Sequence, residues 1–443
     1  MKFVLVNPNW QFDGSIYFGC REPHLPLEYG YAKALLERAG HDATIVDGQL
    51  DDLTRAEIRQ RVKDADPDAI VVTTAPSYLF WRCPPPELRV PQETLADLAD
   101  LPGLRIAVGP HASTTPVATL RKLGCDVVVM GECEEVLPRL AAPADRWHEI
   151  ASIAYQRDGQ PCVQGGVAAV DMQQLPALQW PAAAVAGHRH HHHRFDTTSV
   201  AAGAEMETSR GCPYHCTFCA KDNFRNAYRK RPLATILAEL DGLIAHGVEY
   251  VYFIDEIFLP QKDLLEALVE RPVKFGVQTR IDLWNTAMLD LLGAAGCVSI
   301  EAGVESISEV GRNLLDKKSR LSTDEISQRL VHARSAVPFV QANLLDAQVD
   351  DPEAVEAWRQ YLIGHGVWAN KPVPLFPYPG SPDYAKRWGR PDDQAWERAV
   401  NHYLANFDEF SDIQDARPLP LAALERSDAD APRSASSASR HVD

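Results

Sequence analysis

Three cysteines, Cys212, Cys216 and Cys219, lie close together in the segment SRGCPYHCTFCAK (209–221). A structural zinc ion takes four protein ligands, and so does an ordinary four-iron cluster. The spacing C-x3-C-x2-C therefore predicts a [4Fe–4S] cluster in which three irons carry thiolates and the fourth iron has no protein ligand. The alternatives are a zinc knuckle that lacks one ligand and cysteines that are neighbours by chance.

The composition limits the kinds of protein that can hold such a site. With 443 residues, 45% of them apolar, the chain is long enough to bury more than one core, so two or three domains are expected. A formal charge of −17 without a basic stripe argues against a nucleic-acid partner. The sequence contains no run of eighteen apolar residues, so no membrane span is predicted. The apolar stretch at the N-terminus is too short for a signal peptide. Nine cysteines, three of them with ligand spacing, indicate a reducing, cytoplasmic protein.

Residues 1 to 140 alternate between short apolar runs and amphipathic stretches. The runs predict five strands, at KFVLV (2–6), ATIVD (43–47), AIVVTT (69–74), RIAVG (105–109) and DVVVMG (126–131). Helical spacing lies between them at 29–40, 55–65 and 116–124. The alternation predicts an α/β fold with a doubly wound, Rossmann-like parallel sheet, which binds ligands at the carboxyl ends of its strands.

The segments that follow these strands are the candidate binding loops. They cover residues 7–30, 73–86, 109–114 and 131–135. The first is too long for a simple connection, which favours a functional role. No G-x-G-x-x-G follows the first strand, which argues against a dinucleotide site. The alternative is an accessory domain whose loops bind nothing.

The cysteine segment follows a predicted strand and opens a second series of strands and helices. Six strands are expected, at 204–209, 248–255, 274–279, 297–303, 339–345 and 371–376. Between them lie helices such as 231–247 and 321–333, the latter with a capping box of Ser322 and Glu325. Six β/α units predict a partial (β/α)6 TIM-type barrel with its site at the carboxyl ends of the strands.

The predicted division is a Rossmann-like domain at 1–142, a bridge at 143–200, the barrel at 201–385 and a helical extension at 386–443. Trp147, Ile153 and Tyr155 suggest a small strand pair in the bridge, which also holds the histidine-rich run His188–His193. That run predicts either a metal site or a basic loop near an anionic group. The last fifteen residues contain too little apolar surface to fold. Six further cysteines are expected as buried thiols, the first two of them on candidate binding loops: Cys20, Cys83, Cys125, Cys133, Cys162 and Cys297.

The cysteine motif, with an aromatic residue before its last cysteine, resembles that of the radical SAM superfamily. The segments YFIDEIF (252–258) and FPYPGSPDY (376–384) resemble patterns of its cobalamin-type members, whereas FVQANLLDAQVDD (339–351) departs from their glycine-containing strand end. The resemblance implies that S-adenosylmethionine occupies the vacant ligand position on the fourth iron. It also implies an external electron donor of flavodoxin or ferredoxin type. The residues implied to contact S-adenosylmethionine are Phe218, Asp255, Glu256, Gln278, Arg280, Glu301, Gly303, Glu305 and Ser306.

The first domain resembles the cobalamin-binding domain that precedes many radical SAM domains. The resemblance rests on the order of NPNW, LEYGYAKALLERAGH, GPHAS and GE-x-E over residues 1–140. The residues it implies for cobalamin are Asn7, Pro8, Thr73, Thr74, Tyr78, Gly109, Pro110, His111, Ser113, Gly131 and Glu132. A D-x-H-x-x-G motif is absent, which implies base-off cobalamin without a protein histidine ligand. His24 and His111 are the candidates near the corrin, the alternative being buried, hydrogen-bonded loop histidines.

The resemblance implies a cobalamin-dependent radical SAM enzyme with a small-molecule substrate between the two cofactors. The first hypothesis is a methyltransferase that acts on an unactivated carbon or phosphorus of a metabolite or natural-product intermediate, through a 5′-deoxyadenosyl radical and methylcobalamin. The second is radical cyclisation, ring contraction or 3-amino-3-carboxypropyl transfer without methylation. The third is a non-catalytic cobalamin or redox sensor. The expected partners include neither nucleic acid nor a membrane.

Overall fold

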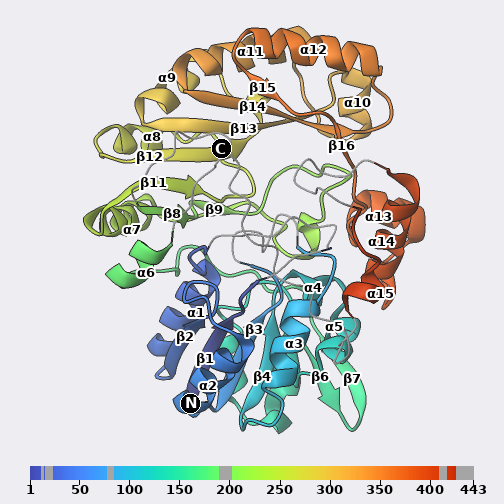
Figure 1. Cartoon of the computed structure of the whole chain (residues 1–443). Coiled ribbons are helices and arrows are strands. Elements are labelled where there is room, and N and C mark those ends of the chain that lie inside the picture. Colours follow the sequence, from blue (N-terminus) through green and yellow to red (C-terminus); the bar gives the residue numbers. More distant parts are fainter. Residues whose placement is uncertain (11–13, 15–22, 77–83, 189–201, 409–416, 426–443) are drawn as a thin grey trace.

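The computed structural model describes residues 1–10, 14, 23–76, 84–188, 202–408 and 417–425 (Figure 1). Two helix-covered sheets form the two halves of this part of the chain. Within it, no helix is long and apolar enough to cross a membrane. Tyr78, Cys20, Cys83, the histidines at 190–193 and the last fifteen residues lie outside the described residues, so the predictions made for them stay predictions.

The first sheet has the order β2-β1-β3-β4-β5-β6-β7, and its first five strands are parallel. The strands are β1 (Lys2–Asn7), β2 (Asp42–Asp47), β3 (Ala69–Thr73), β4 (Leu104–Val108), β5 (Val127–Val129), β6 (Ile153–Arg157) and β7 (Gln160–Gln164). Its helices are α1 (Leu27–Arg38), α2 (Arg55–Ala65), α3 (Arg89–Asp97), α4 (Pro110–Thr114), α5 (Pro116–Leu123), η2 (Leu137–Ala141) and η3 (Ala144–Glu149). This is the predicted doubly wound architecture.

Alternating side chains of β1 show why both faces are covered. Leu5 packs with α1 and η2 on one face, whereas Val4 and Val6 pack with α2, α3 and α5 on the other. A parallel strand buried on both faces needs such a continuous apolar run. The prediction missed α3 and α4. It also placed the pair β6 and β7 in a bridge, whereas β6 pairs antiparallel with β5 and so extends the first sheet.

The second sheet is the predicted partial barrel, with the order β15-β14-β13-β12-β11-β8 and all pairs parallel. Its strands are β8 (Ala202–Met206), β11 (Val248–Phe253), β12 (Lys274–Thr279), β13 (Cys297–Glu305), β14 (Phe339–Asp346) and β15 (Trp368–Ala369). Its helices lie along the outer face: α7 (Leu233–Ala245), α8 (Lys262–Val269), α9 (Thr286–Ala294), α10 (Glu309–Leu314), α11 (Thr323–Ala336) and α12 (Pro352–Gly364). The predicted capping box of Ser322 and Glu325 is present at the start of α11.

The sixth strand differs from the prediction. Instead of one strand over 371–376, two short strands pair with β14: β15 and, further along, β16 (Val373–Pro374). The prolines at 372, 374 and 377 lack backbone N–H groups and cannot supply a regular ladder. The remaining short elements are α6 (Ala182–Gly187), β9 (Ser209–Arg210), η4 (Lys221–Asn223), β10 (Arg229–Lys230) and η5 (Ile281–Leu283).

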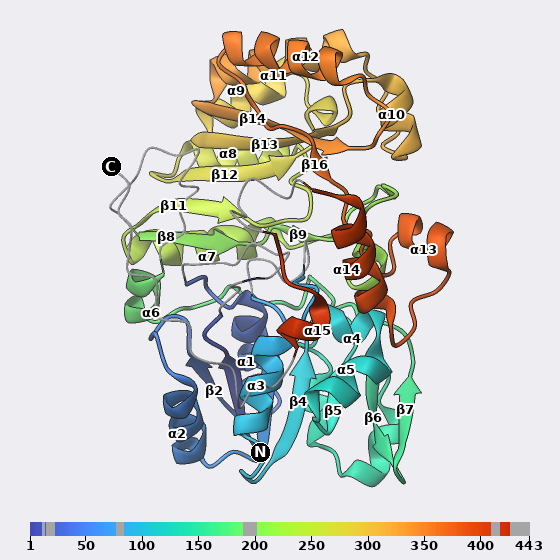
Figure 2. The same cartoon turned by 45° about the vertical axis from the view of Figure 1, so that its right-hand side comes forward.

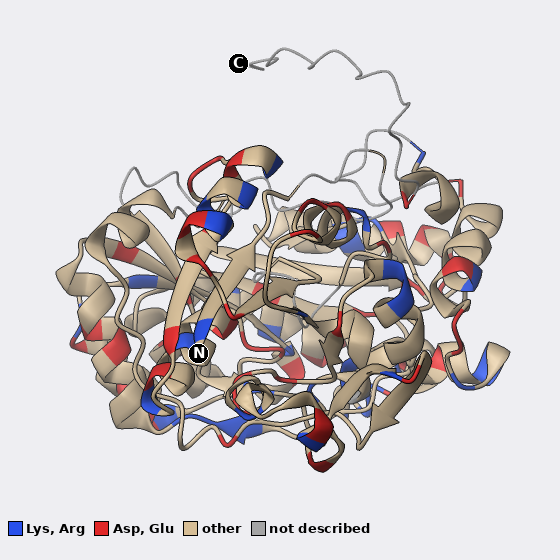
Figure 3. Cartoon of the chain, turned by 90° about the horizontal axis from the view of Figure 1, so that it is seen from below, with Lys and Arg blue, Asp and Glu red and all other residues tan. Residues whose placement is uncertain are grey.

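The C-terminal helices α13 (Pro382–Trp388), α14 (Ala395–Asn406) and α15 (Leu421–Leu424) lie beside both halves (Figure 2). Lys122 of α5 ties them to the first half, because its Nζ donates to Glu397 Oε1 at 2.7 Å and to Glu425 Oε2 at 2.6 Å. Seen from below, acidic and basic residues of the described part are interspersed over the ribbon (Figure 3). The helical extension is therefore packed against the first domain rather than separate from it.

Candidate cofactor site

The cysteine loop begins directly after β9, at a turn that requires glycine. Gly211 has φ +80°, and a Cβ at this position would lie 2.2 Å from the carbonyl oxygen of Ala227. The chain then reverses through Cys212, Cys216 and Cys219, and the backbone N–H of Cys219 donates to the carbonyl of Cys216 at 3.1 Å. As whole residues, all three cysteines are half-buried.

Two carboxylates at the end of β11 hold the approach to this loop. Asp255 accepts from the backbone N–H of Thr208 at 2.7 Å, from the Thr208 hydroxyl at 2.5 Å and from the Ser209 hydroxyl at 2.6 Å. Glu256 accepts from the backbone N–H of Gly211 at 2.8 Å. The structure thus gives both residues, predicted to contact S-adenosylmethionine, a place beneath the loop. Burial raises the pKa of Asp255 to about 7, although the bonds from Ser209 and Thr208 lower it.

The far side of the loop is held by segments from later in the chain. The backbone N–H of Thr217 donates to the carbonyl of Leu315 at 3.1 Å, and its hydroxyl donates to Asp383 at 3.0 Å. Asp383 belongs to the segment FPYPGSPDY, which also receives a hydrogen bond from Asn223 to the carbonyl of Pro379 at 2.9 Å. This segment, identified from its resemblance to the cobalamin-type pattern, therefore buttresses the cysteine loop.

Burial governs the ionisation of the three thiols. It raises the pKa of Cys212 to about 11 and that of Cys219 to about 12, and it also raises the pKa of Cys216. The surrounding protein therefore favours neutral thiols at neutral pH, and binding of iron would release their protons. In the described part of the chain, no three His, Cys, Asp or Glu side chains are gathered for a single metal ion. A four-iron cube places its three cysteine-bound irons at separate corners, so it needs more widely spaced sulfurs than one ion does.

The inner face of the barrel carries a row of polar side chains. Gln278 of β12 lies opposite Glu301 of β13, which lies opposite Gln341 of β14. Their sequence neighbours Val277, Ile300 and Val340 are in the apolar core, as alternation along a strand requires. The Oε1 atoms of both glutamines are buried without a hydrogen-bond partner, and Gln341 is only 8% exposed. Buried amide oxygens of this kind are available to a bound ligand.

Arg280 lies between this row and the cysteine loop. Its guanidinium carbon is 4.1 Å from the centre of the Tyr214 ring, within the cysteine segment. Two of its nitrogens donate to Asp282, at 3.1 Å and 2.7 Å, while Nη1 is buried without a partner. A guanidinium held in this way and left with one free donor suits an anionic ligand beside the cysteines. Phe218, the predicted adenine neighbour, is half-buried in the same loop.

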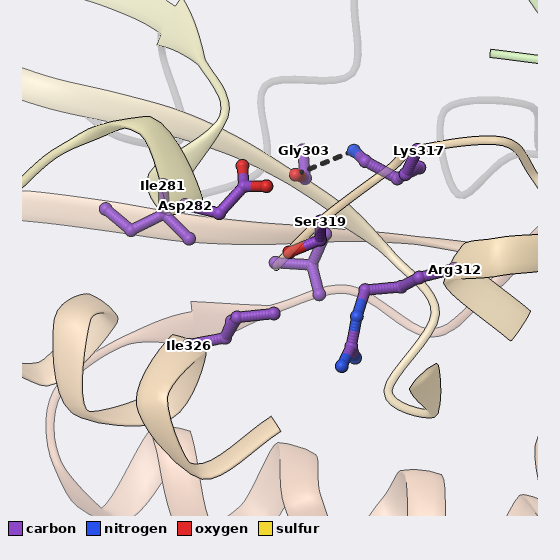
Figure 4. Close-up of a pocket in the computed structure, with 8 residues that line it drawn as sticks. Ile281, Asp282, Gly303, Arg312, Lys317, Ser319 and Ile326 are labelled. Carbon is purple, nitrogen blue, oxygen red and sulfur yellow. Dashed lines mark hydrogen bonds between the residues drawn. The ribbon is translucent and has the colours of Figure 1, made fainter. Parts of the chain in front are cut away.

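The predicted residues at the end of β13 form hydrogen bonds of their own. Lys317 donates to the carbonyl of Gly303 at 3.0 Å and forms an ion pair with Glu305. Figure 4 shows the Lys317–Gly303 bond at the rim of a small pocket whose wall includes Asp282. Ser306 is fully buried and donates to Asp350 at 2.9 Å. Gly303 and Glu305 thus lie near the site, whereas Ser306 stabilises the strand end from behind.

The side chains predicted to contact cobalamin already have hydrogen-bond partners within the first domain. Asn7 donates to Asp47 at 2.8 Å and accepts from Trp10 at 2.9 Å. The Thr73 hydroxyl donates to the carbonyl of Ala75 at 2.8 Å. The Ser113 hydroxyl accepts from the backbone N–H of Gly131 at 2.7 Å.

Glycines and prolines of the same edge offer backbone rather than side chains. Gly109 has φ +136°, and a Cβ at this position would lie 2.2 Å from the Thr74 hydroxyl. Pro110 begins α4, and Pro8 follows β1 directly. Gly109 therefore lets α4 approach the end of β3. The strand order of the sheet reverses between β1 and β3, and a sheet of this kind binds its ligand in the crevice at that point.

The two candidate histidines both have partners. His111 is buried, with Nε2 2.6 Å from the carbonyl of Pro85 and Nδ1 3.0 Å from the Thr74 hydroxyl. Because a carbonyl only accepts, Nε2 donates and Nδ1 accepts from Thr74. Burial lowers the pKa of His111 to about 4. His24 forms a buried ion pair with Glu205 of β8, so this loop residue contacts the barrel. Both histidines are buried and hydrogen-bonded, but only His24 lies in a loop, because His111 belongs to α4.

An ion-pair network that the sequence did not reveal joins the two halves beside the cysteine loop. Glu132, predicted as a cobalamin contact, accepts from Arg229 at 2.6 Å and 2.9 Å and lies 3.4 Å from Arg225. Glu134 accepts from Arg210 at 2.7 Å. Although burial opposes its ionisation, the arginines hold the pKa of Glu132 down at about 2. The only signal in the sequence is that two glutamates in GE-x-E and several arginines near the cysteines carry opposite charges.

Comparison with known families matches two segments of the chain to two family models. The model of the B12 binding domain matches residues 21–141, and that of the radical SAM superfamily matches residues 206–350. The chain contains a radical SAM domain preceded by a B12-binding domain. The predicted family and fold class are confirmed, and the two domain types agree with the predicted S-adenosylmethionine and cobalamin.

Curated relatives of the chain have different named activities. An uncharacterized methyltransferase of Pyrococcus horikoshii is 26% identical over 70% of this chain and 66% of its own length. An anaerobic magnesium-protoporphyrin IX monomethyl ester cyclase of Cereibacter sphaeroides is 26% identical over 78% of this chain and 56% of its own length. The chain thus spans less than two thirds of either relative.

Solved structures share the fold of both domains. The radical S-adenosylmethionine methyltransferase TsrM of Kitasatospora setae, solved with cobalamin and a [4Fe–4S] cluster, has a TM-score of 0.68 and 18% identity over 87% of this chain and 78% of its own. The cobalamin-dependent radical enzyme OxsB, solved with aqua-cobalamin and S-adenosylmethionine, has a TM-score of 0.66 and 16% identity over 91% of this chain and 66% of its own. At these identities the likeness concerns the fold.

Proposed function

We propose that the chain is a cobalamin-dependent methyltransferase that acts on an unactivated carbon or phosphorus of a small molecule. The observation that carries the proposal is the position of the cysteine loop, held between the barrel and the carboxyl edge of the B12-binding domain. Its neighbour Arg210 pairs with Glu134 of that domain, and α4 of that domain lies against η4, which begins two residues after Cys219. A substrate at this junction would be within reach of both cofactors.

The residues around the loop fit the expected cofactors. Cys212, Cys216 and Cys219 would hold three irons of the cluster, and Arg280 would receive the carboxylate of S-adenosylmethionine. The free amide oxygens of Gln278 and Gln341 would accept hydrogen bonds from hydroxyl or N–H groups of that molecule or of the substrate. When bound, the cluster and S-adenosylmethionine supply a carbon radical, and cobalamin supplies a transferable methyl group.

The first experiment determines the cofactors and the fate of S-adenosylmethionine. Protein made with cobalamin and purified without oxygen is expected to contain about four irons and one corrin per chain. It is then incubated with a reductant, methyl-labelled S-adenosylmethionine and a small-molecule extract. Methyl transfer would yield S-adenosylhomocysteine, 5′-deoxyadenosine and a labelled product. Iron without corrin, even after hydroxocobalamin is added, would rule out methylation through cobalt.

Radical cyclisation is the second candidate, favoured by the likeness to the cyclase of Cereibacter sphaeroides over 78% of this chain. The two reactions differ in their by-products. Cyclisation would form 5′-deoxyadenosine without S-adenosylhomocysteine and would leave no label in the product. Methylthioadenosine would instead indicate transfer of the aminocarboxypropyl group.

A further inference from the structure

The ion-pair network between the domains contacts the two residues that lead into the cysteine loop. Arg210, 0% exposed, donates to Glu134 of the B12-binding domain at 2.7 Å and to Glu207 of the barrel at 2.9 Å. The next residue, Gly211, donates its N–H to Glu256 at 2.8 Å. Both the side chain at 210 and the backbone at 211 are thereby fixed directly before Cys212.

The carboxylates from the B12-binding domain are themselves fixed. Gly131, at φ +82°, turns the chain after β5 so that a Cβ there would lie 2.3 Å from the carbonyl of Ala168. Glu132 accepts from the backbone N–H of Val170 at 2.5 Å and pairs with Arg229. Glu134, two residues on, therefore meets Arg210 from a segment that is hydrogen-bonded to residues 168–170.

The network is costly for an element that only stabilises the fold. Glu134 and Arg210 are both about fully buried, and Glu134 Oε2 and Arg210 Nη2 have no hydrogen-bond partner. Removing two charges from water costs several kcal/mol per ion, so a buried pair is weak evidence for stability. Its location, two residues before a predicted cluster ligand, points to a geometric role instead.

We infer that Glu134, supported by Glu132, is a positioning residue for the cluster: the B12-binding domain fixes Arg210 and thereby sets the cysteine loop for binding of S-adenosylmethionine. The inference rests on the proposed function, because it assumes a cluster at Cys212, Cys216 and Cys219. It makes the geometry of the radical site dependent on a carboxylate of the neighbouring domain. Nothing in the two domain matches taken separately implies this dependence.

The test compares wild type with Glu134→Gln, a substitution that keeps the shape and removes the charge. Iron content, thermal unfolding and the electron paramagnetic resonance spectrum of the reduced cluster are measured with and without S-adenosylmethionine. We expect Glu134→Gln to keep about four irons but to bind S-adenosylmethionine at least about tenfold more weakly, with a reduced spectral change, because a buried charge-assisted bond is lost. Glu135→Gln, at the exposed neighbouring position, is the matched control and is expected to behave as wild type.

A double variant separates positioning from stability. Glu134→Leu with Arg210→Met removes both charges of this pair, a change that often leaves stability unchanged or improved. Glu207 loses its bond from Arg210 but keeps the bond from Arg225 at 2.9 Å. We expect unfolding near that of wild type and a persisting loss of the spectral response. Recovery of the response in this variant, or a wild-type response in Glu134→Gln, would overturn the inference alone. Wild-type protein without iron would overturn the proposed function and the inference with it.

Discussion

The barrel mouth and the edge of the B12-binding domain use their polar residues differently. In the described part of the barrel, Arg280, Gln278 and Gln341 each keep a buried polar atom without a partner. At the edge of the B12-binding domain, the side chains of Asn7, Thr73, His111 and Ser113 are hydrogen-bonded to other side chains or to backbone of the same domain. The barrel is therefore prepared to bind through side chains. The edge of the B12-binding domain presents tight turns and backbone groups, which suit a large, flat ligand bound by shape complementarity.

The comparison predicts that single substitutions impair cofactor binding strongly in the barrel and weakly at the edge of the B12-binding domain. The largest effect is expected for Cys216→Ala, which removes a cluster ligand. Iron is expected to fall from about four per chain to near zero, measured by iron analysis and visible absorbance. Cys162→Ala, in β7 of the B12-binding domain, is the control and is expected to retain the iron. Full iron in Cys216→Ala would place the cluster elsewhere.

Arg280→Gln is expected to have the next largest effect. The substitution removes the free Nη1 donor beside the cysteine loop, so affinity for S-adenosylmethionine should fall about tenfold or more, as measured by equilibrium binding to the reconstituted protein. Arg271→Gln removes another arginine, one that pairs with Asp241 on the outer surface, and should leave affinity unchanged. Equal affinities in both variants would show that Arg280 does not face the ligand.

The raised pKa of Asp255 predicts that the free energy of unfolding falls as the pH rises. Its pKa is raised to about 7, above the ordinary value of about 3.9, so the folded state binds more protons than the unfolded state between these values. The contribution of Asp255 to stability is therefore fully present below about pH 4 and is lost as pH rises through 7, by on the order of 4 kcal/mol. Asp255→Asn keeps a side chain that can bond to Thr208 and Ser209 and should remove this dependence. Denaturant unfolding from pH 5 to 8 measures it, and identical slopes for wild type and variant would contradict it.

The smallest effect is expected for His111→Gln at the other edge. Both ring nitrogens of His111 already have partners in the protein, so the absorption spectrum of bound cobalamin should not change. The variant is expected to lose some stability but to bind cobalamin with the wild-type spectrum. A shift of the spectrum in His111→Gln would make this histidine a cobalt ligand and would reverse the comparison.

Local apolar periodicity was enough to predict most of the strands and helices. The strands at 43–47 and 274–279 and the helix at 55–65 lie within one residue of the structure, because each has a clear apolar period and strong ends. The short strands β15 and β16 were misplaced because a proline-rich segment has no such period. The pairing of β6 with β5 depends on a neighbour 24 or more residues away, which periodicity does not encode.

The sequence indicated which strand ends carry polar residues, but it did not reveal the partners that these residues bond to. The cysteine loop and Arg280 lie together, but Asp255 and Glu256 support the loop from below, and Glu132 pairs with arginines. Strand ends are recognisable from sequence, whereas the partner that each carboxylate finds is not. The Glu134–Arg210 pair joins residues 76 positions apart in different domains, so it appears only in the folded chain.

The central claim is that one chain holds the cluster and cobalamin facing a shared space. Pulsed electron paramagnetic resonance on protein that contains both the reduced cluster and cob(II)alamin tests it most directly. The account predicts a resolved magnetic coupling between the two centres, which is lost in the matched Cys216→Ala protein. Two full-strength signals without coupling would place the cofactors apart and would contradict the account.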